Sequence, residues 1–262
     1  MLGAIIGDII GSAYEWNNVK YKEFDLFTNT TKFTDDTVMT IATIDAIIND
    51  IPFNKSYKKW FRKYPDEDYG SNFHYWGNSD SLEPYNSWGN GSAMRVSPVG
   101  FYYNTLEEVL LKSKESAEAT HNHPEGIRGA QATAAAIYMA KNNKDKLEIK
   151  EFIENTFGYE LNEKLDSIRE WYDFDESCQG TVPQAIIAFL ESNDFEDAIR
   201  NAISIGGDSD TLACITGGIA EAYYKEFPKN ILIKANSILP LEMKTLVNKL
   251  YGKSVLDYPI YN

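Results

Sequence analysis

Apolar residues recur three and four positions apart along most of the chain, which is the period of an α-helix with one buried face. The segments with this period lie near residues 3–14, 36–49, 105–118, 126–141, 149–157, 183–191, 195–204, 209–226, 229–238 and 241–251. No stretch alternates apolar and polar residues between hairpin-type turns, as half-buried strands do. The sequence therefore predicts an all-α fold.

Local start signals support three of these helices. The segment "TLEE" at Thr105–Glu108 has the form of a capping box, and Asp194 stands before an apolar periodic run as an N-cap. In "TVPQAIIAFL", Thr181 and Pro183 suit the first turn of a helix, where proline needs no amide hydrogen. We expect helices to begin close to these residues.

Glycines mark two helices as tightly packed. Gly3, Gly7 and Gly11 recur every four residues and so lie on one helix face, and Gly217 and Gly218 lie inside a second apolar run. A glycine in a helix interior costs about 1 kcal/mol relative to alanine. We expect crowding to be the reason for these residues, with the first helix central in the fold.

One stretch, Tyr64–Gly100, lacks a helical period and is rich in glycine, asparagine, serine and aromatic residues. Irregular segments of this length inside a compact domain are uncommon and are often functional. The chain shows no linker composition and no internal repeat. The sequence thus predicts one compact many-helix domain over residues 1–262.

Composition and charge limit the classes of molecule that this chain is expected to bind. The chain has 262 residues, of which 43% are hydrophobic, so it can bury a sizeable core. Its formal net charge of −14 argues against general binding to nucleic-acid backbones or anionic membranes. A small anionic ligand remains compatible with this charge if a bound metal ion compensates it locally.

The cysteines and the N-terminal segment favour a cytoplasmic protein. Cys178 and Cys214 have neither metal-binding nor redox spacing and are expected to be plain thiols, with Cys214 inside a helix. The apolar segment "MLGAIIGDIIGSAYEW" has no positive leading region, and Asp8 and Glu15 interrupt it. It therefore matches neither a signal peptide nor a membrane span.

Two acidic clusters carry the candidate chemistry. Asp35 and Asp36 stand in "KFTDDTVMT", and Asp208 and Asp210 stand in "IGGDSDTLACI" near the other end of the chain. Each cluster lies at the start of an apolar helix, where carboxylates also serve as caps and interact favourably with the helix dipole. Each cluster taken alone is therefore explained by capping.

Taken together, the two clusters point to a metal site. Four carboxylates at the starts of buried helices need compensation if they lie near each other. Mg²⁺, Mn²⁺ and Ca²⁺ take oxygen ligands such as carboxylates, hydroxyls and water, whereas zinc prefers histidine and cysteine, and neither residue type stands within the two clusters themselves. Adjacent Asp35 and Asp36 point in different directions and so could serve two ions.

Four blocks, in this order, resemble the ADP-ribosylglycohydrolase family, which includes the dinitrogenase-reductase-activating glycohydrolase. They are "GAIIGDIIGSAYE", "FTDDTVMT", "YNSWGNGSAMRVSPVG" with "THNHPEGIRGAQATA", and "IGGDSDTLACITGGIAEAYY". The resemblance covers about residues 3 to 226. It implies a single all-α domain with a binuclear Mg²⁺ or Mn²⁺ centre in a cleft.

The resemblance also implies roles for individual residues. The implied metal ligands are Thr34, Asp35, Asp36, Asp208, Asp210 and Thr211. The implied catalytic residues are Glu15, which matches a mobile glutamate near the scissile bond, and Asp35 and Asp36. The implied substrate-binding residues are Gly70, Ser87, Trp88, Gly89, Asn90, Gly91 and His121. Asp68 stands where relatives often have glycine, so the distal part of the cleft is expected to recognise a different leaving group.

The implied reaction is metal-dependent hydrolysis of the bond between ADP-ribose and a modified protein side chain or another acceptor. Glu15 or a metal-linked carboxylate would act as the base. Two alternatives remain: an inactive ADP-ribose-binding protein, and a dinuclear-metal hydrolase of other nucleotides or phosphate esters. The acceptor, the choice between Mg²⁺ and Mn²⁺, and the oligomeric state stay open.

Several candidate residues also have ordinary structural interpretations. Glu15 could be a solvated helix end, and Trp88 could fill a gap in the core instead of stacking on adenine. Arg95 could pair with a buried carboxylate or with a phosphate. His121 and His123 are two apart with no further zinc ligand nearby, and the proline after His123 indicates the start of a helix.

Overall fold

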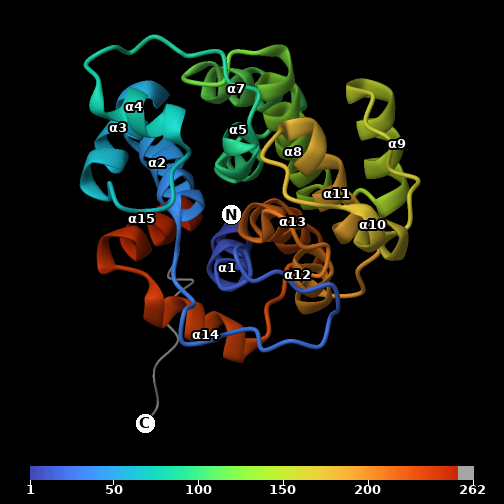
Figure 1. The fold of residues 1–262 in the computed structure, drawn as a ribbon. Helices are drawn as coiled ribbons and strands as arrows, with labels where there is room; N and C mark the ends of the chain where they lie inside the picture. The colour runs from blue at the N-terminus through green and yellow to red at the C-terminus, as the bar shows by residue number, and fades with distance from the viewer. Residues whose placement is uncertain (253–262) are drawn as a thin grey trace.

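In the computed structural model, which describes residues 1–252, helices α1 (Leu2–Gly11) and α13 (Ser209–Tyr224) lie side by side at the centre of the molecule (Figure 1). A Cβ atom built on Gly7 would lie 2.0 Å from a carbonyl oxygen of α13, and one on Gly3 would lie 2.2 Å from the carbonyl oxygen of Gly217. Only hydrogen side chains allow this approach. The predicted crowding at these glycines is confirmed.

Replacing Gly7 by alanine is expected to lower the free energy of unfolding by about 2 kcal/mol, because an extra methyl group in a packed interior forces backbone shifts. Urea denaturation followed by circular dichroism measures this loss. Gly70→Ala is the matched control, since its added Cβ meets no atom within 4 Å. Equal losses for the two variants would contradict the packing argument.

The other helices surround this central pair. Their bounds are α2 Asp35–Asn49, α3 Phe53–Lys63, α4 Ser71–Asn78, α5 Gly91–Met94, α6 Ser97–Tyr102, α7 Leu106–Glu118, α8 Pro124–Lys141, α9 Lys146–Phe157, α10 Leu165–Trp171, α11 Cys178–Leu190, α12 Phe195–Ile203, α14 Lys229–Ile238 and α15 Leu241–Tyr251. Helices α8, α11 and α12 pack on α13, whereas α2 packs on α1 and carries α3 and then α4 (Figure 1). The main hydrophobic core extends through these layers from Met1 to Val247.

The all-α prediction is confirmed over the described residues, which contain no strand beyond one isolated bridge between Gly89 and Ser177. Every predicted helical segment coincides with a helix. None of the helices in this part of the chain is long and apolar enough to cross a membrane. The two cysteines are free and buried, and Cys214 lies inside α13 as expected.

The expectation that Tyr64–Gly100 is irregular is wrong in part. The stretch contains α4, α5 and most of α6, which are too short to show several turns of a helical period. Helix α4 is held by aromatic packing, because the rings of Phe73 and His74 lie 5.9 Å and 5.3 Å from that of Phe61 on α3. Tertiary contacts therefore form a helix where the local pattern is weak.

Two start signals are confirmed and one is wrong. The carboxylate of Asp194 accepts a hydrogen bond from the backbone N–H of Asp197 at 2.8 Å. The hydroxyl of Thr105 accepts one from the backbone N–H of Glu108 at 3.2 Å. Helix α11, however, begins at Cys178 and leaves Pro183 in its interior. Its cap is Ser177, which accepts from a backbone N–H one turn later, so the helix starts before the proline.

Candidate functional site

A cleft of about 470 Å³ lies where the loop after α1 meets α4, the loop before α5, and the starts of α2 and α13. Seven carboxylates line it: Glu15, Asp35, Asp36, Asp68, Glu176, Asp208 and Asp210. The two acidic clusters from opposite ends of the chain therefore meet in space. The central pair of helices brings them together, because Gly11 at the end of α1 packs against the backbone of Asp210.

A buried carboxylate on α1, Asp8, holds the start of α2. It accepts hydrogen bonds from the backbone N–H groups of Thr34 at 3.1 Å and Thr37 at 3.0 Å. It also accepts from the hydroxyl of Thr34 at 2.7 Å and from that of Thr37. Asp8 thereby sets the position of Asp35 and Asp36, which lie between these two threonines. A lone aspartate within an apolar helix was the sequence signal for this role.

The start of α13 is set by a glycine turn and by Asn90. Gly206 and Gly207 have φ values of 78° and 70°, which glycine adopts without the strain of a Cβ atom. The carboxylate of Asp208 makes no capping hydrogen bond to its own helix and instead accepts from the side-chain amide of Asn90 at 2.7 Å. Capping therefore does not explain Asp208.

Asn18 joins the loop that carries Glu15 to the loop that carries Asp208. Its amide nitrogen lies 2.8 Å from the carbonyl oxygen of Glu15 and 3.0 Å from that of Gly207, and it donates to both. Its amide oxygen accepts from the backbone N–H of Gly207 at 2.7 Å. This side chain couples the positions of the two loops, a role that the sequence pattern did not reveal.

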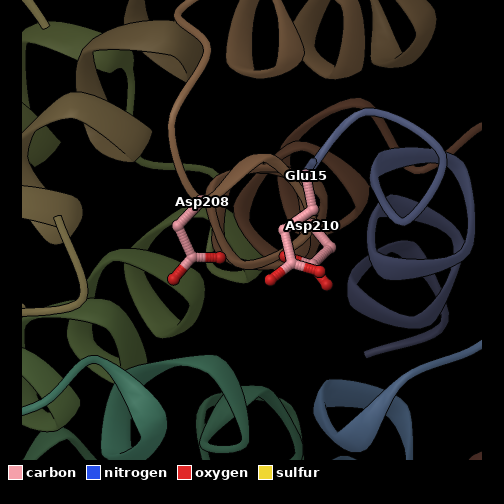
Figure 2. A group of neighbouring side chains, drawn as sticks. All are labelled: Glu15, Asp208 and Asp210. Atoms are coloured by element: carbon pink, nitrogen blue, oxygen red, sulfur yellow. The ribbon is translucent and has the colours of Figure 1, made fainter. Parts of the chain in front are cut away.

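Figure 2 shows Glu15 beside Asp208 and Asp210, with carboxylate oxygens of the three residues within 4.8 Å of one another. The hydroxyl of Thr211 donates to Oδ1 of Asp36 at 3.2 Å, while Oδ2 of Asp36 is buried with no hydrogen-bond partner in the described structure. Glu15 is partly buried within this group. It is therefore not a solvated helix end.

Burial and neighbouring carboxylates raise the pKa values of Glu15, Asp36 and Asp210. Burial is the largest cause for Glu15 and the charge of Asp208 comes next, and together they raise its pKa to about 7. Burial, followed by the charge of Asp8, holds the pKa of Asp36 well above its ordinary value. Burial and then Asp208 raise the pKa of Asp210 in the same way. The cluster thus lacks charge compensation.

The donor set fits hard divalent cations. Among residues 1–252, the carboxylates Glu15, Asp35, Asp36, Asp208 and Asp210 form no ion pair with lysine or arginine. Uncompensated buried carboxylates are costly, and an oxygen without a partner, such as Oδ2 of Asp36, is suited to bind a metal ion. The oxygen-only chemistry matches Mg²⁺ or Mn²⁺ better than zinc.

The unfolding temperature of protein kept in EDTA is expected to fall as the pH rises from about 4 to about 7. A carboxyl group whose pKa is higher in the folded state binds more protons there than in the unfolded state, so stability falls as pH rises between the two values. The folded-state pKa is about 6 for Asp8, which burial raises, and about 7 for Glu15, which sets this window. Thermal melts across the window measure the trend.

Addition of Mg²⁺ is the control for that experiment. It is expected to restore the unfolding temperature most at the upper end of the window, because cations compete with protons for these carboxylates and stabilise only the folded state. A metal-free protein whose unfolding temperature rises through the window would contradict the electrostatic argument.

Most of the predicted site residues line the cleft, and two do not. The lining includes Glu15, Gly70, Asp35, Asp36, Ser87, Gly89, Asn90, Gly91, His121, Asp208, Asp210 and Thr211. Thr34 is buried and does not line the cleft, and its hydroxyl donates to Asp8. Trp88 is 54% exposed, with its ring 5.7 Å from that of His123, so the interpretation as a core-filling residue is wrong.

The cleft also contains residues that were not predicted as site residues. They are Trp16, Tyr69, Ser71, Asn72, Phe73, Tyr85, Met94, Arg95 and Glu176, whereas Asp68 was already expected in the distal part of the cleft and does line it. Arg95 is fully buried and, among the described residues, pairs with no carboxylate. His123 caps α8 and accepts from the Glu125 backbone N–H at 3.2 Å, which confirms the predicted helix start.

Comparisons with known proteins agree with this fold. The sequence profile of the ADP-ribosylglycohydrolase family matches residues 1–258. The chain is 26% identical to the ADP-ribosylhydrolase ARH3 of Mus musculus, over 86% of this chain and 82% of the relative. It is 27% identical to the ADP-ribosylarginine hydrolase Tri1 of Pseudomonas putida, over 86% of this chain and 69% of the relative. A solved structure, described as an ADP-ribosylglycohydrolase-related protein complex, has the same fold, with a TM-score of 0.71 at 23% identity. The match covers 97% of this chain and 96% of the chain in that structure.

Proposed function

This chain belongs to the ADP-ribosylglycohydrolase family, and from that premise we propose that it is a metal-dependent hydrolase. Its reaction is cleavage of the glycosidic bond between ADP-ribose and a modified protein side chain or another acceptor. The observation that carries the proposal is the group of buried carboxylates in the cleft that has no basic partner. The relatives that are named as ADP-ribosylhydrolases support the reaction class.

The proposed metal ligands are the side chains of the two acidic clusters. They are Asp35, Asp36, Asp208, Asp210 and Thr211, and they would hold two Mg²⁺ or Mn²⁺ ions. Metal ions in such a site supply Lewis-acid assistance and lower the pKa of bound water. A ligand role for Thr34 stays a prediction, because its hydroxyl donates to Asp8 in this structure.

The proposed reaction uses the cleft carboxylates for proton transfer. A water oxygen bonds to C1″ of the distal ribose while the bond from C1″ to the acceptor breaks, and the departing acceptor atom takes up a proton from a protonated carboxyl group of the cleft. The proton of the attacking water goes to a carboxylate, for which Glu15, Asp35 and Asp36 are the candidates. Glu15 stands on a loop with its carboxylate within 4.8 Å of those of Asp208 and Asp210, so it lies close enough to the proposed metal site to act there as a base or as a further ligand.

The proposed binding site for ADP-ribose is the part of the cleft that lies beside the acidic clusters and is lined by small residues and His121. Gly70, Ser87, Gly89, Asn90, Gly91 and His121 line it, and glycines leave room for a ligand to approach the backbone. The loop 87–91 is held by Asn90, whose backbone N–H donates to the carbonyl oxygen of Glu176 at 2.7 Å. Stacking of adenine on Trp88 stays a prediction, since its exposed ring lies outside the cleft lining.

The test is release of ADP-ribose from a panel of arginine-linked, serine-linked and base-linked substrates, each with Mg²⁺, with Mn²⁺ and with EDTA. Release from at least one substrate that stops in EDTA supports the proposal and identifies the acceptor. Binding of ADP-ribose without release from any substrate indicates an inactive binding protein. Hydrolysis of a generic phosphodiester in place of these substrates indicates a dinuclear-metal hydrolase of other nucleotides or phosphate esters.

We further propose a cytoplasmic location. The support is the pair of free buried thiols, Cys178 and Cys214, which is typical of proteins from reducing compartments. Fractionation of cells that express the tagged full-length chain checks this location.

A further inference from the structure

Arg95 is a fully buried cation in the wall of the cleft. Its Nη2 donates to the carbonyl oxygen of Ser116 at 3.0 Å and to the hydroxyl of Thr120 at 2.8 Å, and its guanidinium lies 4.2 Å from the ring centre of Tyr57. Its Nε and Nη1 have no hydrogen-bond partner in the part of the chain that is described. A guanidinium only donates hydrogen bonds, so Thr120 must accept here.

The hydroxyl of Thr120 links this cation to His121. Its oxygen accepts from Arg95 and lies 2.7 Å from Nδ1 of His121. Thr120 is fully buried, so its hydroxyl proton needs an acceptor, and of its two neighbours, Tyr85 and His121, we assign this role to Nδ1 of His121, which lies at hydrogen-bond distance. Nδ1 then carries no proton, and in a neutral imidazole the single proton lies on Nε2.

The surroundings of His121 keep the ring neutral. The residue is 5% exposed, and burial is the largest cause that holds the pKa of its imidazole well below the ordinary value. The charge of Arg95 lowers this pKa further. The ring therefore carries one donor and one acceptor.

The donor nitrogen faces the glycine loop of the cleft. A Cβ atom built on Gly91 would lie 3.0 Å from Nε2 of His121, and one on Gly89 would lie 3.6 Å from it. No residue within 1–252 forms a hydrogen bond with Nε2. The N–H group is thus available to a ligand that presents an oxygen acceptor above this loop.

We propose that Arg95 and Thr120 are positioning residues that hold His121 in its Nε2–H form, so that the ring donates a hydrogen bond to a phosphate oxygen of the bound ligand. The identification of the acceptor as a phosphate oxygen rests on the proposed function, because ADP-ribose carries a diphosphate. An anionic oxygen suits this wall better than a hydroxyl group because the buried Arg95 has no carboxylate to balance its charge. We call the path of hydrogen bonds from Arg95 through Thr120 to His121 the relay, and it rests only on the contacts described above.

The test is nitrogen-15 NMR of the full chain with labelled histidine, recorded with Mg²⁺ and with and without ADP-ribose. The chain has only three histidines, so His74→Asn and His123→Asn assign the remaining signals to His121. In the wild type we expect the shift of Nε2 to be that of a protonated nitrogen and the shift of Nδ1 that of an unprotonated one. ADP-ribose is expected to move the Nε2 signal. The opposite assignment of the proton would overturn the relay.

Two variants of Thr120 separate positioning from simple packing. Thr120→Val keeps the shape but removes the hydroxyl, so we expect a mixture of both ring forms and an affinity for ADP-ribose about tenfold lower, as for one lost hydrogen bond. Thr120→Ser keeps the hydroxyl and is expected to restore both readouts. In turnover, Thr120→Val is expected to raise KM with little change in kcat.

The outcomes distinguish the relay from the proposed function. Unchanged nitrogen shifts in Thr120→Val would overturn the relay even if the enzyme is active. Absence of ADP-ribose binding to the wild type would overturn the phosphate contact, while the shifts still decide the ring form. Binding with the expected shifts but without hydrolysis would overturn only the proposed function.

Discussion

Replacing Asp36 by asparagine is expected to abolish metal binding and to lower kcat/KM for release of ADP-ribose by about 10³-fold or more. The metal contribution to the transition state is worth several kcal/mol, and each 1.4 kcal/mol corresponds to a factor of ten. Asp36 is the most informative position to replace, because its Oδ2 is buried without a hydrogen-bond partner while its Oδ1 accepts from the hydroxyl of Thr211. Asp208→Asn is expected to have a similar effect from the other cluster.

Calorimetric titration with Mn²⁺ and release of ADP-ribose from the best substrate measure the two losses. Asp166→Asn is the control, since the side chain of Asp166 is 94% exposed and lies outside the cleft lining. The helical circular dichroism spectrum is expected to persist in all variants. Full turnover by Asp36→Asn, or by wild type stripped with EDTA, would rule out the role of the metal.

Replacing Asp8 by leucine is expected to lower the free energy of unfolding by about 3 kcal/mol or more and to weaken metal binding. Leucine leaves the backbone and hydroxyl donors of Thr34 and Thr37 buried without their acceptor, and each unsatisfied group costs about 1–3 kcal/mol. The start of α2 then loses its anchor on α1. Loss of a group that orients metal ligands typically lowers metal affinity by about 10- to 100-fold.

Urea denaturation and Mn²⁺ titration test both parts of this prediction. Asp8→Asn keeps one acceptor oxygen, so its losses are expected to be smaller than those of Asp8→Leu. Asp45→Asn is the matched control, because Asp45 is buried on the same helix α2 but bonds to Lys59 and Trp60 away from the cleft. It is expected to lower stability while metal affinity stays unchanged. Unaltered metal affinity in Asp8→Leu would show that Asp8 serves stability alone.

The helices and the acidic clusters could be predicted because their signals are local. The period of apolar residues, the caps at Thr105 and Asp194, and the four-residue spacing of glycines all act within a few turns of one helix. The same reasoning failed at α11, where Ser177 caps the helix ahead of the expected proline. It also missed α3, α4, α5, α6 and α10, and for α4 the reason is that the aromatic contacts that hold this helix come from α3.

The sequence by itself determined the all-α class, the family and the oxygen donors of the two acidic clusters, since these depend on residue types and their spacing. Only the tertiary structure decided which carboxylates lack a basic partner, that Asp8 anchors α2, and that Arg95 reaches His121 through Thr120. It also showed that Trp88 lies outside the cleft lining. The physical reason is that charge compensation and burial depend on atoms a few ångströms apart, and those atoms come from segments distant in the chain.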